Sequence, residues 1–462
     1  MALTVDEKKD IINRIAGDQT RRREIGIARE YYYIDNPILR KGVLVDAEDM
    51  LRKADNRIAD NAHQLITDEE VDYLFSYAPI IDIGSSEANI KLTETLGDKF
   101  LKTIRALDVE ACNSGCAWLH WWLEKQDGKN AFKYASVPSD QVLPIIEDSL
   151  ELNFKRLIRY YKTTRQEGIV KEAYLRVEVW DALKCEYFLL PGDTEYTSLG
   201  GSKDDGTLLH NLGRIPFIMC PNNNRHQGNL KKYQGFIDAY DIVLSGYVND
   251  VMDIQQVIYI LENYAGTDLG EFTKELKKYK TALVGNDGID GSKGDLRTLT
   301  IDIPVDARNA LLETLKKQMY IAGQALSRDV VSVGNASGET LKFFYRDLDL
   351  KVGDKEVEFS VSFKELTRII CEILSIPITK DIRITFTRNR ISNDKETAEI
   401  CKNSVGIIPQ KLIWANHPFV DNVEECEKMW EEEHAETDIY ADLNKTANAK
   451  AKKLNDDEVE EE

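Results

Sequence analysis

The stretch FIDAYDIVLSGYVNDVMDIQQVIYILEN, residues 236–263, predicts one long helix. Its apolar side chains recur at spacings of three and four, which is the period of a helix with one buried face. At about 1.5 Å per residue such a helix is roughly 40 Å long, and it exceeds the average length of helices in globular proteins. The positions that carry this pattern are Ile237, Tyr240, Val243, Leu244, Tyr247, Val251, Ile254, Val257, Ile258 and Leu261.

The residues that follow predict a compact module and then a returning helix. The module, residues 264–303, is expected to hold a helix at 271–279 and strands at 281–284 and 299–303 around a Gly/Asp turn. Pro304 then opens a second long apolar-periodic segment at 306–327, as proline often does at the first turn of a helix. Two antiparallel helices with a small module at their far end form a stalk. Side-by-side packing in a ring would bury its apolar stripes.

The C-terminal part of the chain continues the helical pattern. A Gly/Ser/Asn-containing segment, DVVSVGNASG at 329–338, separates the second long helix from a third at 339–374. A strand is expected at 382–386, and helices at 394–435. From residue 436 the chain is polar and ends in an acidic cluster, a composition that buries too little apolar surface to fold. We therefore expect a disordered tail at 436–462.

The N-terminal part of the chain predicts helices first and strands afterwards. Helices are expected at 6–33, 48–76 and 86–112. Alternating apolar patterns then predict a mainly antiparallel sheet unit, with an exposed loop at 192–206. Its strands are expected at 117–123, 131–134, 137–144, 157–161, 174–180 and 185–190, with a further extended stretch at 216–224. Together these segments define an α+β chain.

The composition excludes several classes of protein. With 462 residues, 60 basic and 80 acidic side chains, the chain carries a formal charge of −20, whereas ordinary nucleic-acid binders present a basic face. A DNA-binding repressor, a histone-like protein and a polybasic membrane-surface protein are therefore not expected. The seven scattered cysteines form no disulfide framework and indicate a reducing compartment. We expect neither a signal peptide nor a membrane span.

The sequence offers no recognisable catalytic or cofactor motif. Cys112 and Cys116 lack a second pair at zinc spacing, and the six histidines are isolated. The glycine-rich segment 288–294 lacks the Gly-Lys-Ser/Thr ending of a phosphate loop. In residues 334–338 the serine is displaced by one position from a nucleophile elbow. We therefore expect no enzyme, no cofactor and no metal.

A set of short segments in a fixed order resembles one known family. They lie at residues 31–39, 57–61, 71–75, 115–120, 137–145, 213–218, 222–224, 237–241 and 245, then at 337–338, 341–342, 404–409, 420–422 and 425. From about residue 30 to 435, the sequence is similar to the portal proteins of tailed bacteriophages of the siphophage type, which are head-to-tail connector rings.

The resemblance implies a portal-type α+β fold with an α/β wing, a helical stem, a small α/β clip and a helical crown. The implied boundaries are 1–233 and 339–390 for the wing, 234–263 and 304–328 for the two stem helices, 264–303 for the clip, 329–341 for a tunnel loop and 391–435 for the crown. The implied assembly is a ring, usually of twelve subunits, at one capsid vertex of the virion, assembled in the host cytoplasm. Double-stranded DNA would pass through its axis during packaging and ejection.

The resemblance also implies partners and site residues. The partners are other copies of the chain, the terminase large subunit, head-completion or adaptor proteins, and the scaffold and major capsid proteins, with no membrane. The DNA-facing loop would contain Val333, Gly334, Asn335, Ala336, Ser337 and Gly338, and the motor-docking clip would contain Lys277, Lys278, Tyr279 and Lys280. Lys342 and Arg346 are candidates for phosphate contact.

Alternative readings of these residues remain open. The loop also fits an ordinary connection between helices, and the lysines and Arg346 also fit solvated helix faces. The acidity agrees with a DNA conduit, because each phosphate–cation contact adds affinity that would stall translocation. Two other functions fit the sequence: a nucleotide- or metal-dependent enzyme with a non-local site, and a scaffold-like interaction protein that forms no ring.

Overall fold

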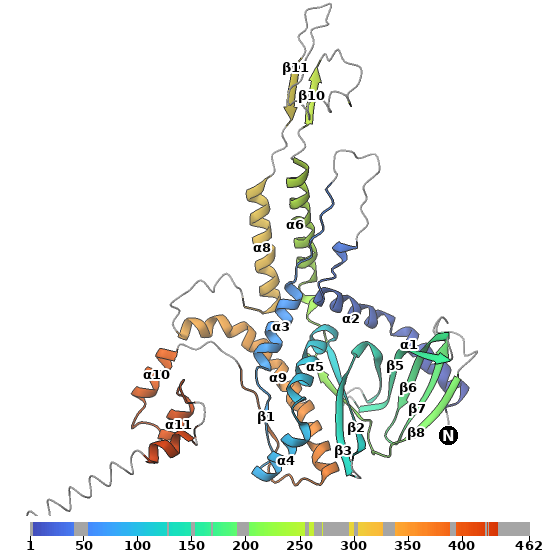
Figure 1. The fold of residues 1–462 in the computed structure, drawn as a ribbon, viewed down its shortest axis with the longest axis vertical. Helices are drawn as coiled ribbons and strands as arrows, with labels where there is room; N and C mark the ends of the chain where they lie inside the picture. Colours follow the sequence, from blue (N-terminus) through green and yellow to red (C-terminus); the bar gives the residue numbers. More distant parts are fainter. Residues whose placement is uncertain are drawn as a thin grey trace, which may run out of the picture. The chain divides into compact units, whose positions relative to one another are not determined.

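The computed structural model divides into two compact units, Met1–Arg328 with Asp347–Asn389, and Asp329–Arg346 with Arg390–Glu462. Figure 1 shows the chain coloured along the sequence. The structure describes residues 3–40, 54–126, 129–148, 153–167, 170–191, 203–254, 258–262, 270, 295–299, 304–326, 338–388, 394–420, 423 and 425–432.

A five-stranded antiparallel sheet forms one layer of the first unit. Its order is β4-β5-β6-β7-β8, with strands Val142–Asp148, Asn153–Glu167, Val170–Trp180, Lys184–Pro191 and Lys203–Leu209. Alternate side chains such as Tyr160, Val177 and Phe188 point to one face, as the period of two requires, and they pack on the apolar stripe of α1 (Val5–Gly17). The predicted antiparallel unit is confirmed, although residues 203–206 belong to β8 and not to a loop.

A three-stranded sheet, β3-β2-β9, packs against helix α5 (Phe100–Ser114) (Figure 1). Its strands are Lys129–Val137, Cys116–Gln126 and Phe217–Pro221. Gly115 caps α5 at φ 84° and turns the chain directly into β2. A left-handed conformation of this kind is open to glycine and strained for other residues.

Two of the predicted N-terminal helices are each divided in two. The helix predicted at 6–33 becomes α1 and α2 (Gln19–Tyr32), because Asp18 leaves helical geometry and its carboxylate binds Arg21 and the Tyr160 hydroxyl. The helix predicted at 86–112 becomes α4 (Ser86–Leu96) and α5, with Gly97 at φ 65° between them. Short 3-10 helices lie at Pro37–Leu39, Ser139–Gln141 and Leu230–Lys232.

The helix predicted at 48–76 is confirmed only as α3 (Ala62–Leu74). Residues 54–61 are not helical, because their backbone groups bond to side chains of α6 instead of to one another, as described below. Residues 48–53 of that prediction lie outside the described residues.

The prediction of one long helix at 236–263 is wrong at its C-terminal end. Helix α6 spans Gln234–Ile254, and strand β10 (Ile258–Glu262) then pairs antiparallel with β11 (Asp295–Leu299). The sequence of β10, IYILE, is rich in β-branched and aromatic residues that favour strands. The helix predicted at 271–279, the strand at 281–284 and residues 300–303 lie outside the described residues.

Helix α8 (Val305–Gly323) returns antiparallel to α6 and lies beside it (Figure 1). Arg308, at the start of α8, pairs with Asp250 near the end of α6, and its guanidinium lies 5.5 Å from the centre of the Tyr247 ring. The prediction of two antiparallel long helices is therefore confirmed, with α6 shorter than expected.

Helix α9 (Gly338–Leu374) is the longest described element, and from residue 347 onward it belongs to the first unit. Phe359 and Phe363 on its buried side pack against Phe75 and Phe386. After α9, strand β12 (Arg383–Thr385) pairs with β1 (Ile80–Asp82).

The described part of the second unit contains helices joined by turns after residue 390. It contains α10 (Asp394–Asn403), α11 (Gln410–Ala415) and helical residues 425–432. Trp414 and Trp430 pack edge to face there, with ring centres 5.6 Å apart. The predicted tail at 436–462 lies outside the described residues. Among the described helices, none is long and apolar enough to cross a bilayer.

Candidate functional site

Four charged side chains meet in the interior of the first unit, between α3, α5 and α9. We call Glu70, Asp108, Lys351 and Lys355 the charged junction; they are 1%, 0%, 8% and 1% exposed. Burying ions without partners is costly, so each needs an opposite charge or a hydrogen bond. Figure 1 shows the three helices close together in the body of the unit.

Glu70 is the centre of the charged junction. One of its carboxylate oxygens lies 2.6 Å from Lys351 Nζ and accepts a 2.7 Å hydrogen bond from Asn229 Nδ2, and the other pairs with Lys355. Lys355 Nζ also lies 2.7 Å from Asp108 Oδ1 and 3.0 Å from Cys112 Sγ. Two carboxylates and two ammonium groups therefore tie three helices together.

The charged junction also holds the end of α8. Lys351 Nζ donates a 2.8 Å hydrogen bond to the carbonyl of Gly323, and Glu69 accepts one from the Leu326 backbone N–H at 3.1 Å. A Cβ added at Gly323 would lie 3.0 Å from Ile66, so glycine permits the close approach of α8 to α3. The C-terminal end of α8 is thus joined to the body by charge and by packing.

The pKa values of the junction follow from burial and from charge. Burial would raise the pKa of Glu70, but Lys351 and Lys355 outweigh it and lower that pKa to about 2. Burial raises the pKa of Asp108 to about 6, assisted by the charge of Glu70 and opposed by Lys355. The pKa of Lys355 is raised despite its burial, because Asp108, Cys112 and Glu70 favour the ammonium form.

A neutral histidine extends the polar network beside the junction. His63 Nε2 lies 2.8 Å from Asn113 Oδ1 and Nδ1 lies 2.7 Å from the Tyr233 hydroxyl. Because Asn113 Oδ1 only accepts, Nε2 carries the proton and Nδ1 accepts from Tyr233 in the neutral ring. Burial lowers the pKa of His63 to about 4.

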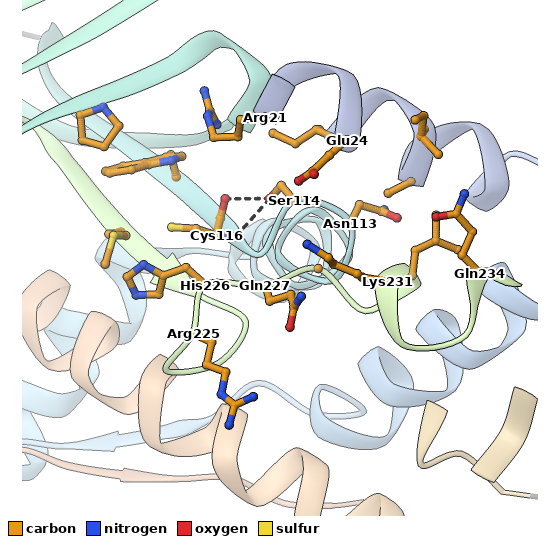
Figure 2. Close-up of a pocket in the computed structure, with 18 residues that line it drawn as sticks. Arg21, Glu24, Asn113, Ser114, Cys116, Arg225, His226, Gln227, Lys231 and Gln234 are labelled. Atoms are coloured by element: carbon orange, nitrogen blue, oxygen red, sulfur yellow. Dashed lines mark hydrogen bonds between the residues drawn. The ribbon is translucent and has the colours of Figure 1, made fainter. Parts of the chain in front are cut away.

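A cavity of about 600 Å³ lies between α2, the α5–β2 turn and residues 225–234 (Figure 2). Two polar side chains in its wall, Arg21 and Ser114, bond to the chain itself. Arg21 binds Asp18 and the carbonyls of Ser139 and Val142. The Ser114 hydroxyl bonds to the carbonyls of Glu110 and Cys116 and not to a base, so it lacks the partner of a catalytic nucleophile.

The structure places only some of the predicted site residues. Arg346 is exposed on α9, Lys342 lies in the same helix, and Gly338 is the first residue of that helix and not part of a loop. Val333, Gly334, Asn335, Ala336 and Ser337 lie outside the described residues. Lys277, Lys278, Tyr279 and Lys280 also lie outside them. Among the described residues, no group of three or more His, Cys, Asp or Glu side chains is placed to hold a metal ion.

Sequence reasoning missed the charged junction, although a signal was present. Lys351 and Lys355 lie one turn apart, and Lys355 lies one turn before Phe359 on the buried side of α9. A lysine within an apolar stripe indicates a buried partner. The sequence does not reveal which of its many carboxylates supplies that partner.

The first unit is an α+β body that carries an antiparallel helix pair, and buried charges fix the C-terminal end of α8. The chain belongs to the family described as phage portal protein, SPP1 Gp6-like, whose model matches residues 13–439. Portal proteins are structural components of the phage capsid and not enzymes, in agreement with the expectation drawn from the sequence.

Two curated relatives support this assignment. The portal protein of Clostridium phage phiCD119 is 43% identical over 429 residues, which cover 91% of this chain and 94% of that protein. The portal protein of Bacillus phage SPP1 is 26% identical over 397 residues, which cover 82% of this chain and 76% of that protein. The family inferred from the short motifs is therefore confirmed.

Solved structures with a similar backbone arrangement include chains from the necks of two GTA particles. The neck of a native particle, computed with C12 symmetry, has a TM-score of 0.42 at 11% identity and covers 77% of this chain and 89% of that one. The neck of an empty particle, computed with C6 symmetry, has a TM-score of 0.40 at 10% identity and covers 76% and 88%.

Proposed function

We propose that copies of this chain form a ring at one capsid vertex and conduct double-stranded DNA during packaging and ejection. The ring would have twelve subunits, as is usual for the family, and would assemble in the host cytoplasm. It would bind the terminase large subunit during packaging and head-completion proteins afterwards. Scaffold and major capsid proteins would surround it.

The observation that carries the ring is the set of exposed apolar side chains on the helix pair α6 and α8. On α6, Ile242, Val251 and Met252 are 46–52% exposed, and on α8, Leu311 and Ile321 are 45% and 56% exposed. A pair of helices stabilises itself mainly through an apolar face buried against other elements. Neighbouring copies arranged around an axis would cover these side chains.

The domain boundaries implied by the resemblance are part of this proposal. α6 and α8 correspond to the stem, and α10 and α11 lie within the crown at 391–435. β11 lies within the clip region at 264–303, whereas its partner β10 lies at the end of the segment 234–263 assigned to the first stem helix. Residues 1–233 and 339–390 would form the wing. The tunnel loop at 329–341 would then overlap the start of α9 by four residues.

The charge of the chain supports transient contact with DNA. Acidic side chains outnumber basic ones by 80 to 60, so a wall of average composition repels a duplex instead of holding it. Arg346, exposed on α9, and Lys342 are proposed as sparse phosphate contacts beside the loop at 333–338. Lys277, Lys278, Tyr279 and Lys280 are proposed as the docking surface for the motor.

Negative-stain imaging and native mass spectrometry of the purified chain test the ring. We expect closed rings of one predominant subunit number with a central hole wide enough for a duplex. A matched variant, Leu311→Glu with Ile321→Glu, should lose the rings while keeping the circular dichroism of the folded chain. A folded monomer at high concentration in the wild type would overturn the proposal.

A further inference from the structure

A row of three polar side chains on α6 binds a segment that is distant in the sequence. Asp241, Ser245 and Asn249 are spaced by four residues and therefore lie on one face of the helix. Residues 54–61, ADNRIADN, run along this face without helical structure. The two segments are joined by side-chain-to-backbone hydrogen bonds, and Asn56 Nδ2 also donates to Asn249 Oδ1 at 2.9 Å and contacts Met252 Sδ at 2.8 Å.

The hydrogen bonds form a regular ladder. The backbone N–H groups of Asn56, Ile58 and Asp60 donate to Asn249 Oδ1 at 2.6 Å, Ser245 Oγ at 3.0 Å and Asp241 Oδ1 at 2.7 Å, respectively. Two extended residues advance about 6.6 Å and four helical residues advance about 6.0 Å. The two periods match closely enough for three successive bonds.

The carbonyl groups of the same residues are also bound. Asn249 Nδ2 donates to the carbonyl of Asn56 at 3.2 Å, and Ser245 Oγ donates to that of Ile58 at 3.4 Å. Asn36 Nδ2 donates to the carbonyl of Asp60 at 3.2 Å and to Asp241 Oδ2 at 2.7 Å. Each alternate residue of the segment therefore exchanges both backbone groups with side chains, as it would with a neighbouring strand.

We propose that residues 54–61 form a clasp that fastens α6 to the body of the first unit and opens on its own, before α3 or α6 unfolds. Its residues are half-buried or exposed, and hydrogen bonds of this kind contribute little net stability each. Segments held in this way open locally at low free energy. α3 begins directly after the clasp and has a buried apolar side, including Ile66 and Leu74, so it should stay closed.

The role of the clasp in holding a stem helix in place rests on the proposed function. If α6 is a stem helix in a ring, opening of the clasp in one subunit would release about two turns of that helix from residues 54–61 of the wing. Closed clasps would hold the stem at a fixed position. The clasp itself requires neither a ring nor DNA, so it can be tested independently of both.

Hydrogen exchange of the full-length protein, read by mass spectrometry, tests the clasp. Ile58→Pro removes one donor of the ladder while keeping an extended backbone, and Asn249→Ala removes the last rung from the helix side. In both variants we expect the amides of residues 56 and 60 to exchange about tenfold faster, while α3 is unchanged. Ala59→Pro, whose N–H is not part of the ladder, and Val251→Ala on α6 should leave the exchange as in the wild type.

Two outcomes would overturn the clasp. Unchanged exchange of residues 54–61 in both variants would mean that the ladder does not protect them. Equal acceleration of residues 54–61 and α3 would mean that they open as one unit. Absence of a ring in the imaging experiment, with the expected exchange pattern intact, would refute the proposed function and leave the clasp standing.

Discussion

Lys355 shows how a single residue organises the centre of the first unit. Its ammonium group contacts Glu70 and Asp108 from two other helices, at 1% exposure. Removing one member of a buried ion cluster is costly because the remaining charges lose their partners. The main contribution of Lys355 to stability is therefore that it neutralises two buried carboxylates, which would otherwise lack a counter-charge.

Substitution of Lys355 by methionine should destabilise the protein by about 3 kcal/mol, because Asp108 loses its ammonium partner and Glu70 keeps only one of two. Lys364→Met, on the same helix and half-exposed, should change the free energy of unfolding by less than about 0.5 kcal/mol. The double variant Lys355→Met with Asp108→Asn should recover part of the loss. Chemical denaturation measures all three, and equal effects of the two single lysine variants would contradict this account.

His63 predicts a pH dependence of stability. Its pKa is lowered from 6.5 to about 4 in the folded protein, so the unfolded chain binds more protons between these values. Stability from this group is present above pH 6.5 and is lost as the pH falls toward 4, by about 2 kcal/mol at pH 5. Asp108, with a raised pKa, contributes in the opposite direction between about pH 6 and 4.

The contribution of His63 is therefore measured as the difference between the wild type and His63→Gln in the unfolding free energy that each loses on acidification. Between pH 7.5 and 5, the wild type should lose about 2 kcal/mol more unfolding free energy than His63→Gln does. His226→Gln, at an exposed position, should follow the wild type. A His63→Gln curve parallel to that of the wild type would exclude a buried neutral histidine.

At the scale of the elements, local signals predicted most helices and strands but not their ends. The three-and-four spacing that defines α6 continues through Ile258 and Leu261, yet these residues lie in β10, because pairing with β11 satisfies the same apolar pattern as a strand. The division between α1 and α2 depends on Asp18 binding Tyr160, which is 142 residues away. A contact between residues so far apart in the sequence does not alter the local spacing of apolar residues, so the helical periodicity does not predict it.

The turn from α5 into β2 makes a further prediction. A Cβ at Gly115 would overlap the backbone carbonyl of His226, and its φ of 84° is also unfavourable for alanine. Gly115→Ala should therefore destabilise the protein by about 2 kcal/mol or more.

Gly213→Ala is the control for this turn. Gly213 also has a positive φ, of 71°, but a Cβ there would meet no atom within 4 Å. It should cost about 1 kcal/mol, so the difference from Gly115→Ala reports the steric part of the effect at Gly115. Thermal denaturation of the two variants measures the difference. Equal melting temperatures would show that the backbone at His226 can move to accommodate the added Cβ, which would contradict the steric argument.

At the scale of the whole molecule, the order of many weak motifs predicted the family better than any single motif predicted a site. The segments at 115–120 and 213–218 lie on and beside the paired strands β2 and β9, and the family model spans 13–439. The charged junction and the clasp depend on which segments meet in space. The groups that meet there are separated by about 180 to 285 residues along the chain, so one sequence could not identify them.

The segment proposed as the tunnel loop, between α8 and α9, gives a prediction for the whole assembly. Deletion of residues 335–338 should leave ring formation unchanged and reduce DNA packaging to a small fraction of the wild-type level. Ring images and a packaging assay with purified motor check the two parts. Normal packaging by the deletion variant would remove the role proposed for the loop.

The seven cysteines are all free, and five of them are buried. Burial raises the pKa of the Cys220 thiol to about 12 and also raises the pKa values of Cys112 and Cys185. Because the thiolate is the reactive form, these groups are poorly oxidised and poorly exchanged with disulfides. These three buried thiols should therefore stay reduced when a particle that contains this chain passes from a cell into an oxidising medium.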